Sequence, residues 1–193
     1  VSAVLAVFFG GLALGNALGA RLLRGGRDPL RVYAGLELAI GAAALCVPAW
    51  LALHSSWYPA LWSACGGESA WLDASRVALA LAALGPATLA MGATLPVMAA
   101  ARAAQAAQAG ATRERPAAAA ASALYALNTL GASMGALLAG FVLPTLFGVL
   151  QSTRLAAAGN ALVAGLAWLS ARRWPAAPAT VRGAAPQTQN APN

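Results

Sequence analysis

Glu37 is the residue of this sequence best placed to do chemistry in an apolar setting. It lies in the segment VYAGLELAIG, residues 32–41, where it is the one charged side chain. An ionisable group inside an apolar helix is a candidate proton relay or cation site. The alternative is a salt bridge near the polar end of that helix, to Arg31 or Arg21, and the sequence leaves both interpretations open.

A second set of polar residues follows helical spacing in the stretch SALYALNTLGAS. Ser122, Tyr125, then Asn128 or Thr129, and Ser133 follow at spacings of three and four, and therefore form one stripe on a helix. Such a stripe can line a substrate path, or its hydroxyl and amide groups can bond to neighbouring helices where no water competes. Tyr125, Asn128 and Thr129 therefore join Glu37 as the candidate substrate-binding residues.

The glycines of FFGGLALGNALGARLLRGGR raise the question of a nucleotide-binding loop. Gly11, Gly15 and Gly19 recur at every fourth position, whereas a dinucleotide loop needs a preceding strand and an acidic residue about 20 positions later. The spacing instead puts the three glycines on one helix face, where a neighbouring backbone can approach closely. Gly131 and Gly135 repeat the pattern, which predicts close packing between the two helices that carry these glycines.

Two prolines, Pro86 and Pro96, interrupt the apolar stretch LGPATLAMGATLP. Each removes a backbone hydrogen bond and kinks its helix, and Thr88, Thr94 or neighbouring helices can satisfy the freed carbonyls. Broken helices are frequent where transporters bind or gate, and many membrane prolines are simply bends. Pro86 and Pro96 are therefore candidate hinges.

These motifs lie in a strongly apolar chain. Of its 193 residues 60% are hydrophobic and 9% charged, against roughly 25% charged in soluble domains. A helix needs about 20 mainly apolar residues to cross a bilayer. The sequence therefore predicts an all-α fold, a polytopic bundle of about five transmembrane helices within residues 1–171. The expected spans are 2–23, 32–53, 77–101, 122–147 and 155–171.

The basic residues indicate an orientation. All 12 are arginines, and if the helices alternate in direction, the connectors on one side contain ten of them: Arg21, Arg24, Arg27, Arg31, Arg102, Arg113, Arg115, Arg172, Arg173 and Arg182. The other side contains Arg76 and Arg154. Because basic connectors stay in the cytoplasm, the first residue is expected in the periplasm and the tail, 172–193, in the cytoplasm. An odd number of helices with an outer start also implies a missing helix upstream.

The arginines after the first span have two interpretations. In one, Arg21, Arg24 and Arg27 set the topology and contact anionic lipid headgroups. In the other, they form with Asp28 a charged latch between two helices, with Glu37 reaching back to it. Nucleic-acid binding is set aside, because the arginines are dispersed among hydrophobic spans and no soluble basic patch with interleaved aromatic residues exists.

Motifs typical of catalytic, metal and phosphate sites are absent from the sequence. No metal-ligand spacing, phosphate loop or carboxylate pair is found, so neither an active site nor a cofactor is expected in this chain. Cys46 and Cys65 lie near the outer boundary, where a disulfide is permitted, and the sequence leaves their pairing open. The connector 102–121 is expected to be exposed, and the Pro- and Ala-rich tail 172–193 to be disordered.

Three stretches, which together extend over roughly residues 1–170, resemble a known family: VLAVFFGGLALGNALGARL, LGPATLAMGATLPVM and LYALNTLGASMGALLAGFVLPTLFG. They resemble the membrane part of bacterial proteins described as fused major-facilitator and spermidine-synthase-like, and VYAGLELAIG fits the same pattern. The resemblance implies part of a major-facilitator six-helix half in the bacterial inner membrane. It also implies a helix before this chain begins.

The resemblance carries two expectations about function. The first is a transporter-like membrane module for polyamines or a related cation. The second is a membrane anchor without transport of its own, for a cytoplasmic domain that resembles aminopropyltransferases. That domain, with its Rossmann-like fold and decarboxylated S-adenosylmethionine site, is missing from this chain, as is any second bundle half. Because none of its motifs occurs here, no enzymatic activity is expected of this chain.

Overall fold

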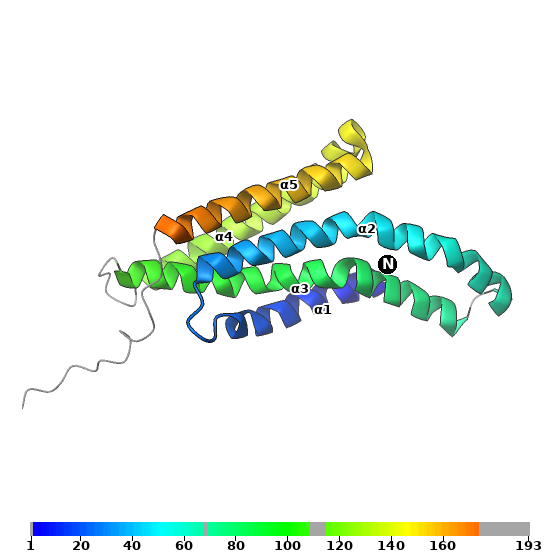
Figure 1. Ribbon diagram of the computed structural model, residues 1–193, viewed down its shortest axis with the longest axis horizontal. Helices are drawn as coiled ribbons and strands as arrows, with labels where there is room; N and C mark the ends of the chain where they lie inside the picture. The colour runs from blue at the N-terminus through cyan, green and yellow to red at the C-terminus, as the bar shows by residue number, and fades with distance from the viewer. Residues whose placement is uncertain (1, 68, 109–114, 174–193) are drawn as a thin grey trace, which may run out of the picture.

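The computed structural model describes residues 2–67, 69–108 and 115–173, and these residues are almost entirely helical. The elements are α1 (Ser2–Leu22), α2 (Pro29–Cys65), α3 (Ala70–Gln108), α4 (Arg115–Leu137), the short π-helix η1 (Leu138–Val142) and α5 (Leu143–Arg173). No strand occurs in these three ranges. Figure 1 shows the long helices arranged along one common axis. The all-α bundle predicted from the sequence is confirmed.

Four helical stretches are long and apolar enough to cross a membrane, where five spans were expected. They are Ser2–Leu22, Pro29–Cys65, Ala70–Ala106 and Ser122–Arg173. The count is four because α4, η1 and α5 follow one another without a break, so that the last stretch contains both of the last two predicted spans. The composition and length of these helices indicate membrane association.

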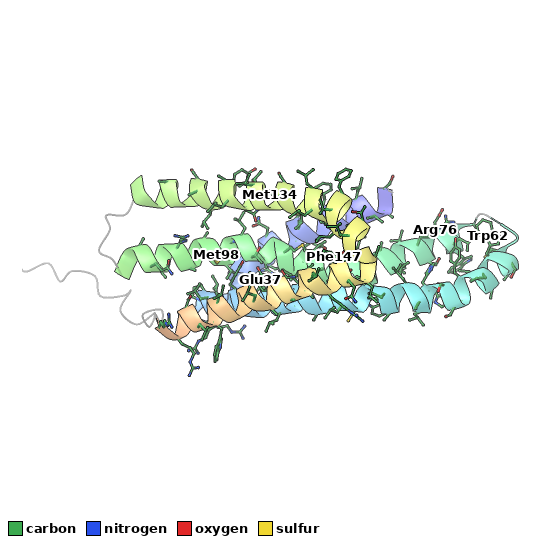
Figure 2. The ribbon with its side chains drawn as sticks, turned by 90° about the horizontal axis from the view of Figure 1, so that it is seen from above. Glu37, Trp62, Arg76, Met98, Met134 and Phe147 are labelled. Atoms are coloured by element: carbon green, nitrogen blue, oxygen red, sulfur yellow. The ribbon has the colours of Figure 1, made fainter. Side chains whose placement is uncertain are left out.

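The chain reverses direction inside the last stretch, at Gly148. The backbone of Gly148 is non-helical, with φ 73° and ψ 165°, a conformation that is open to glycine because it has no Cβ. Just before it, Pro144 follows η1 and has no N–H to donate to the carbonyl one turn earlier, which is a common cause of local π-helical geometry. Figure 2 shows α4 and α5 separating from each other away from this turn, which lies near Phe147.

Helices α2 and α3 are much longer than their predicted spans, 32–53 and 77–101. They contain 37 and 39 residues, and at 1.5 Å per residue each is more than 50 Å long, against roughly 30 Å of hydrocarbon. In Figure 2 the end of this hairpin, marked by Trp62 and Arg76, projects well beyond Phe147. The connector between these two predicted spans is therefore mainly helix, because helical growth from an existing helix is favourable. Helix α2 ends where Gly66 adopts φ 67°.

Helix α1 packs against α3 through its glycines. Gly11, Gly15 and Gly19 are buried, and a Cβ on Gly15 would overlap the backbone carbonyl of Leu89. The contact is mutual, because a Cβ on Gly92 of α3 would overlap the carbonyl of Leu12. The two backbones therefore touch where neither has a side chain, as small residues permit in membrane helices.

The predicted partner of α1 was wrong. The glycine spacing suggested contact between the helices that carry Gly11–Gly19 and Gly131–Gly135, but α1 packs against α3 and not against α4. A Cβ on Gly131 or Gly135 would meet no atom within 4 Å in the described part of the chain. The actual partner, α3, contributes Gly92 to the contact. The spacing of glycines along α1 does not show which helix has a matching glycine.

Helices α2 and α5 form the second close interface. Ala34 and Gly41 of α2 are buried, as are four alanines at helical spacing on α5: Ala157, Ala164, Ala167 and Ala171. A Cβ on Gly41 would lie 3.3 Å from the carbonyl oxygen of Ala157. Many large apolar side chains elsewhere, such as Phe9, face outward. Small residues inside and large apolar residues outside are the arrangement expected of helices surrounded by lipid.

Candidate functional site

Glu37 is enclosed between helices. Its side chain is 9% exposed, and it lies on α2 between two positions that contact α5, Ala34 and Gly41. The Tyr33 side chain, one helical turn earlier, interacts with the Glu37 carboxylate. The carboxylate is thus held by its own helix in a small-residue interface, and this partner satisfies a group that is costly to bury unpaired.

The arginines do not reach Glu37. In the described ranges the one ion pair joins Asp73 and Arg76, 3.0 Å apart, so the expected salt bridge from Glu37 to Arg31 or Arg21 is absent there. Asp28 instead caps α2, with its Oδ1 atom accepting hydrogen bonds from the backbone N–H groups of Leu30 at 2.9 Å and Arg31 at 3.3 Å. An N-cap stabilises the helix start by satisfying free backbone donors. The latch that included Glu37 is therefore not formed.

The polar stripe of α4 lies away from Glu37. Tyr125 is 65% exposed, and Asn128 and Thr129 are exposed as well. In Figure 2, α3 lies between α4, marked by Met134, and the part of α2 that carries Glu37. Glu37 is thus not brought together with the other three candidate substrate-binding residues, and neither of the two pockets described below is lined by both groups.

The two candidate hinges lie inside one continuous helix, α3. The Thr88 hydroxyl donates to the carbonyls of Leu84 and Gly85, at 3.0 and 3.1 Å. Pro96 has a second role, because its Cγ atom lies 2.5 Å from where a Cβ on Gly19 would be. Pro96 therefore belongs to the α1–α3 interface, and a hinge at either proline stays a prediction.

An aromatic cluster at the projecting hairpin was not foreseen. The His54 ring stacks on Tyr58, with centroids 4.7 Å apart, and meets Trp57 edge-on. The Tyr58 hydroxyl accepts hydrogen bonds from Arg76 of α3, at 2.7 Å from Nη2 and 3.1 Å from Nε. The spacing of residues 54, 57 and 58 was the signal that could have found this cluster. It ties the ends of α2 and α3 together beyond the predicted membrane spans.

A small pocket of about 190 Å³ opens beside this cluster. Four of its lining residues come from α2 and four from α3: Trp50, Leu53, His54, Trp57, Ser75, Ala78, Leu79 and Ala82. The Nε2 atom of His54 is buried there without a hydrogen-bond partner in the described residues. The pocket is apolar, and it contains no second ionisable side chain that could share a reaction with the imidazole.

Cys46 and Cys65 are free thiols. Both lie on α2, 19 positions apart, so their Cα atoms are separated by roughly 28 Å, far beyond the reach of a disulfide. The pairing that the sequence left open is therefore excluded. The described residues also contain no group of three or more His, Cys, Asp and Glu side chains that could hold a metal ion.

Comparison with known proteins does not assign this chain to a family. No protein-family model matches the chain, and no curated protein and no solved structure matches it.

Proposed function

We propose that this chain is the membrane module of a bacterial fused major-facilitator/spermidine-synthase-like protein, and that it serves as a membrane anchor rather than as a complete transport pathway. The observation that carries this proposal is the separation of Glu37 from the α4 stripe. A transport site needs its polar groups to converge on one cavity. Here the carboxylate is closed between α2 and α5, while the stripe is exposed on the far side of α3.

The family motifs themselves support an anchoring role. The stretch around Gly11, Gly15 and Gly19 packs on the stretch that contains Gly92 and Pro96. Two of the three stretches that carry the resemblance therefore hold helices together, and their glycine pattern is accounted for by packing without any bound substrate. A rigid helical unit of this kind suits a module that fixes a cytoplasmic domain at the membrane.

The proposed orientation follows from the arginines. Ten of the twelve belong to the connectors and tail that the sequence assigns to one side, and this bias supports an orientation with that side in the cytoplasm, at the bacterial inner membrane. A test labels single cysteines introduced as Arg113→Cys and Arg173→Cys in a protein whose two native cysteines are replaced. Both sites should react only after the inner membrane is made permeable. Labelling of either site from the periplasm would overturn the orientation.

Transport is the second candidate, and one observation favours it. The α4 face that carries Tyr125, Asn128 and Thr129 is exposed, so it is available to line a path completed by helices outside this chain. In that case Glu37 would act as the buried ionisable group of the same path.

Polyamine uptake into vesicles that contain the full-length protein separates the two candidates. The comparison is wild type against Glu37→Gln, with Asp73→Asn as the matched loss of an exposed carboxylate. If the chain is an anchor, all three proteins should give the uptake of empty vesicles. Uptake by wild type that falls tenfold or more in Glu37→Gln and not in Asp73→Asn would establish transport instead.

A further inference from the structure

The end of the α2–α5 interface that carries arginines is hollowed into a groove of about 490 Å³. Its lining residues belong to α2 and α5: Arg31, Ala34, Gly35, Leu38, Ala161, Ala164, Gly165 and Trp168. The groove exists because the lining is mostly alanine and glycine, which leave space between two helix backbones. It runs along roughly two turns of each helix, from a charged end toward an apolar one.

One arginine lines the charged end of this groove, and a second stacks on a tryptophan that lines it. Arg31 lines it directly, and the Cζ atom of Arg172 lies 4.7 Å from the centroid of the Trp168 ring, which lines it as well. Guanidinium groups bind phosphate with directed hydrogen bonds. Tryptophan is enriched at the level of lipid headgroups. Arginines beside a tryptophan are therefore a combination suited to a lipid phosphate at the edge of a bilayer.

The rest of the groove is apolar. No lining residue is acidic, and the nearest carboxylates in sequence are engaged elsewhere, Asp28 with backbone N–H groups and Glu37 with Tyr33. From Ala34 to Leu38 on α2, and across to Gly165 on α5, the walls offer only aliphatic surface. Such a surface fits a hydrocarbon chain, which needs no hydrogen bonds.

We propose that the groove between α2 and α5 binds one anionic phospholipid, with its phosphate at Arg31 and Arg172 and an acyl chain along Gly35, Leu38 and Gly165. Charge complementarity favours this occupant over two alternatives, a second copy of the chain and residues 174–193. A second copy would bring the same arginines face to face. Residues 174–193 contain Arg182 and no acidic residue, so they offer these guanidinium groups no carboxylate side chain.

Native mass spectrometry of the full chain in detergent tests the proposal. Phosphatidylglycerol, phosphatidylcholine and inorganic phosphate are added separately, and the bound fraction is measured. One phosphatidylglycerol should remain bound, with phosphatidylcholine retained at least about tenfold more weakly. The double variant Arg31→Gln/Arg172→Gln should lose most of this preference, whereas Arg24→Gln/Arg154→Gln, which removes the same charge elsewhere, should keep it.

A second variant tests the apolar part without relying on charge. A Cβ on Gly165 would meet no atom within 4 Å, so Gly165→Leu fills the groove without disturbing helix packing. It should abolish retention of both phospholipids. Gly159→Leu is the matched control, because Gly159 is equally open but does not line the groove. Retention of phosphatidylglycerol by Gly165→Leu, equal binding of the two lipids to wild type, binding of inorganic phosphate alone, or a lipid-free dimer would each overturn the proposal.

Discussion

Helices α1 and α4 carry the same spacing of glycines, yet in the described chain one is packed through them and the other is not. On α1, Gly11, Gly15 and Gly19 face α3 so closely that a methyl group at any of them would overlap or crowd its neighbours. On α4, Gly131 and Gly135 face open space. The spacing therefore encodes a capacity for close approach, and whether it is used depends on a complementary small residue on another helix.

The α2–α5 interface lies between these extremes. A Cβ added to its glycine, Gly41, would lie 3.3 Å from the Ala157 carbonyl oxygen, which is tight but does not overlap it. The glycines of α1, α2 and α4 thus form a graded series of environments, in which an added Cβ would overlap a neighbouring atom, crowd one, or meet none. Substituting alanine for glycine adds the same methyl group and the same gain in helix propensity at each site, so differences in stability report the environment alone.

The largest effect is expected for Gly15→Ala. The new Cβ overlaps the carbonyl of Leu89, and because backbone cannot rotate out of the way, α1 must move away from α3. Overpacking of this kind costs about 3 kcal/mol. The free energy of unfolding of the purified protein in detergent, measured by titration with a denaturing surfactant, should fall by that amount. An unchanged value would show that α1 does not pack on α3 through Gly15.

A smaller loss is expected for Gly41→Ala. Its Cβ lies 3.3 Å from the Ala157 carbonyl and 3.4 Å from the Cβ of Asn160, so a shift of a few tenths of an ångström relieves the contact. The expected destabilisation is about 1 kcal/mol, measured by the same surfactant titration. A loss as large as that of Gly15→Ala would place α2 and α5 closer together than the structure has them.

The interaction between Tyr33 and Glu37 belongs to the same interface and should contribute about as much or less. Tyr33→Phe removes the hydroxyl and leaves the ring in the Ala34–Ala164–Ala167 cluster. Interhelical and intramembrane hydrogen bonds are worth about 0.6 kcal/mol on average, and the loss should be of that size. In the background of Glu37→Gln the effect of Tyr33→Phe should shrink. Full additivity of the two changes would show that the side chains do not interact.

The sequence predicted the helical class and the packing role of the α1 glycines, because both follow from periodicity within one segment. It did not predict which helix α1 contacts, since that depends on Gly92, a residue 73 positions beyond Gly19. For Glu37 it left open a proton relay or cation site and a salt bridge to Arg31 or Arg21. The actual partner is Tyr33, a neighbour one turn away, which satisfies the carboxylate without drawing a guanidinium group into the apolar interface.

The length of the α2–α3 hairpin was underestimated for a related reason. Hydropathy marks where lipid can surround a helix and not where the helix ends. Residues 54–65 and 70–76 are helical although they lie outside the predicted spans. The contacts of Tyr58 with His54 and Arg76 hold that extension together. The contact between Tyr58 and Arg76 joins positions 18 residues apart in sequence, which no single-helix pattern contains.

The effect expected for Gly131→Ala has the opposite sign. No atom lies within 4 Å of the added Cβ, so the substitution brings only the helix propensity of alanine, a gain of up to about 1 kcal/mol. The same substitution in the full-length protein tests what covers the open face of α4. If a helix outside this chain packs on the open face of α4, Gly131→Ala should stabilise the isolated chain and destabilise the full-length protein. Stabilisation in both would mean that lipid covers this face, and the glycine spacing of α4 would then have no packing role at all.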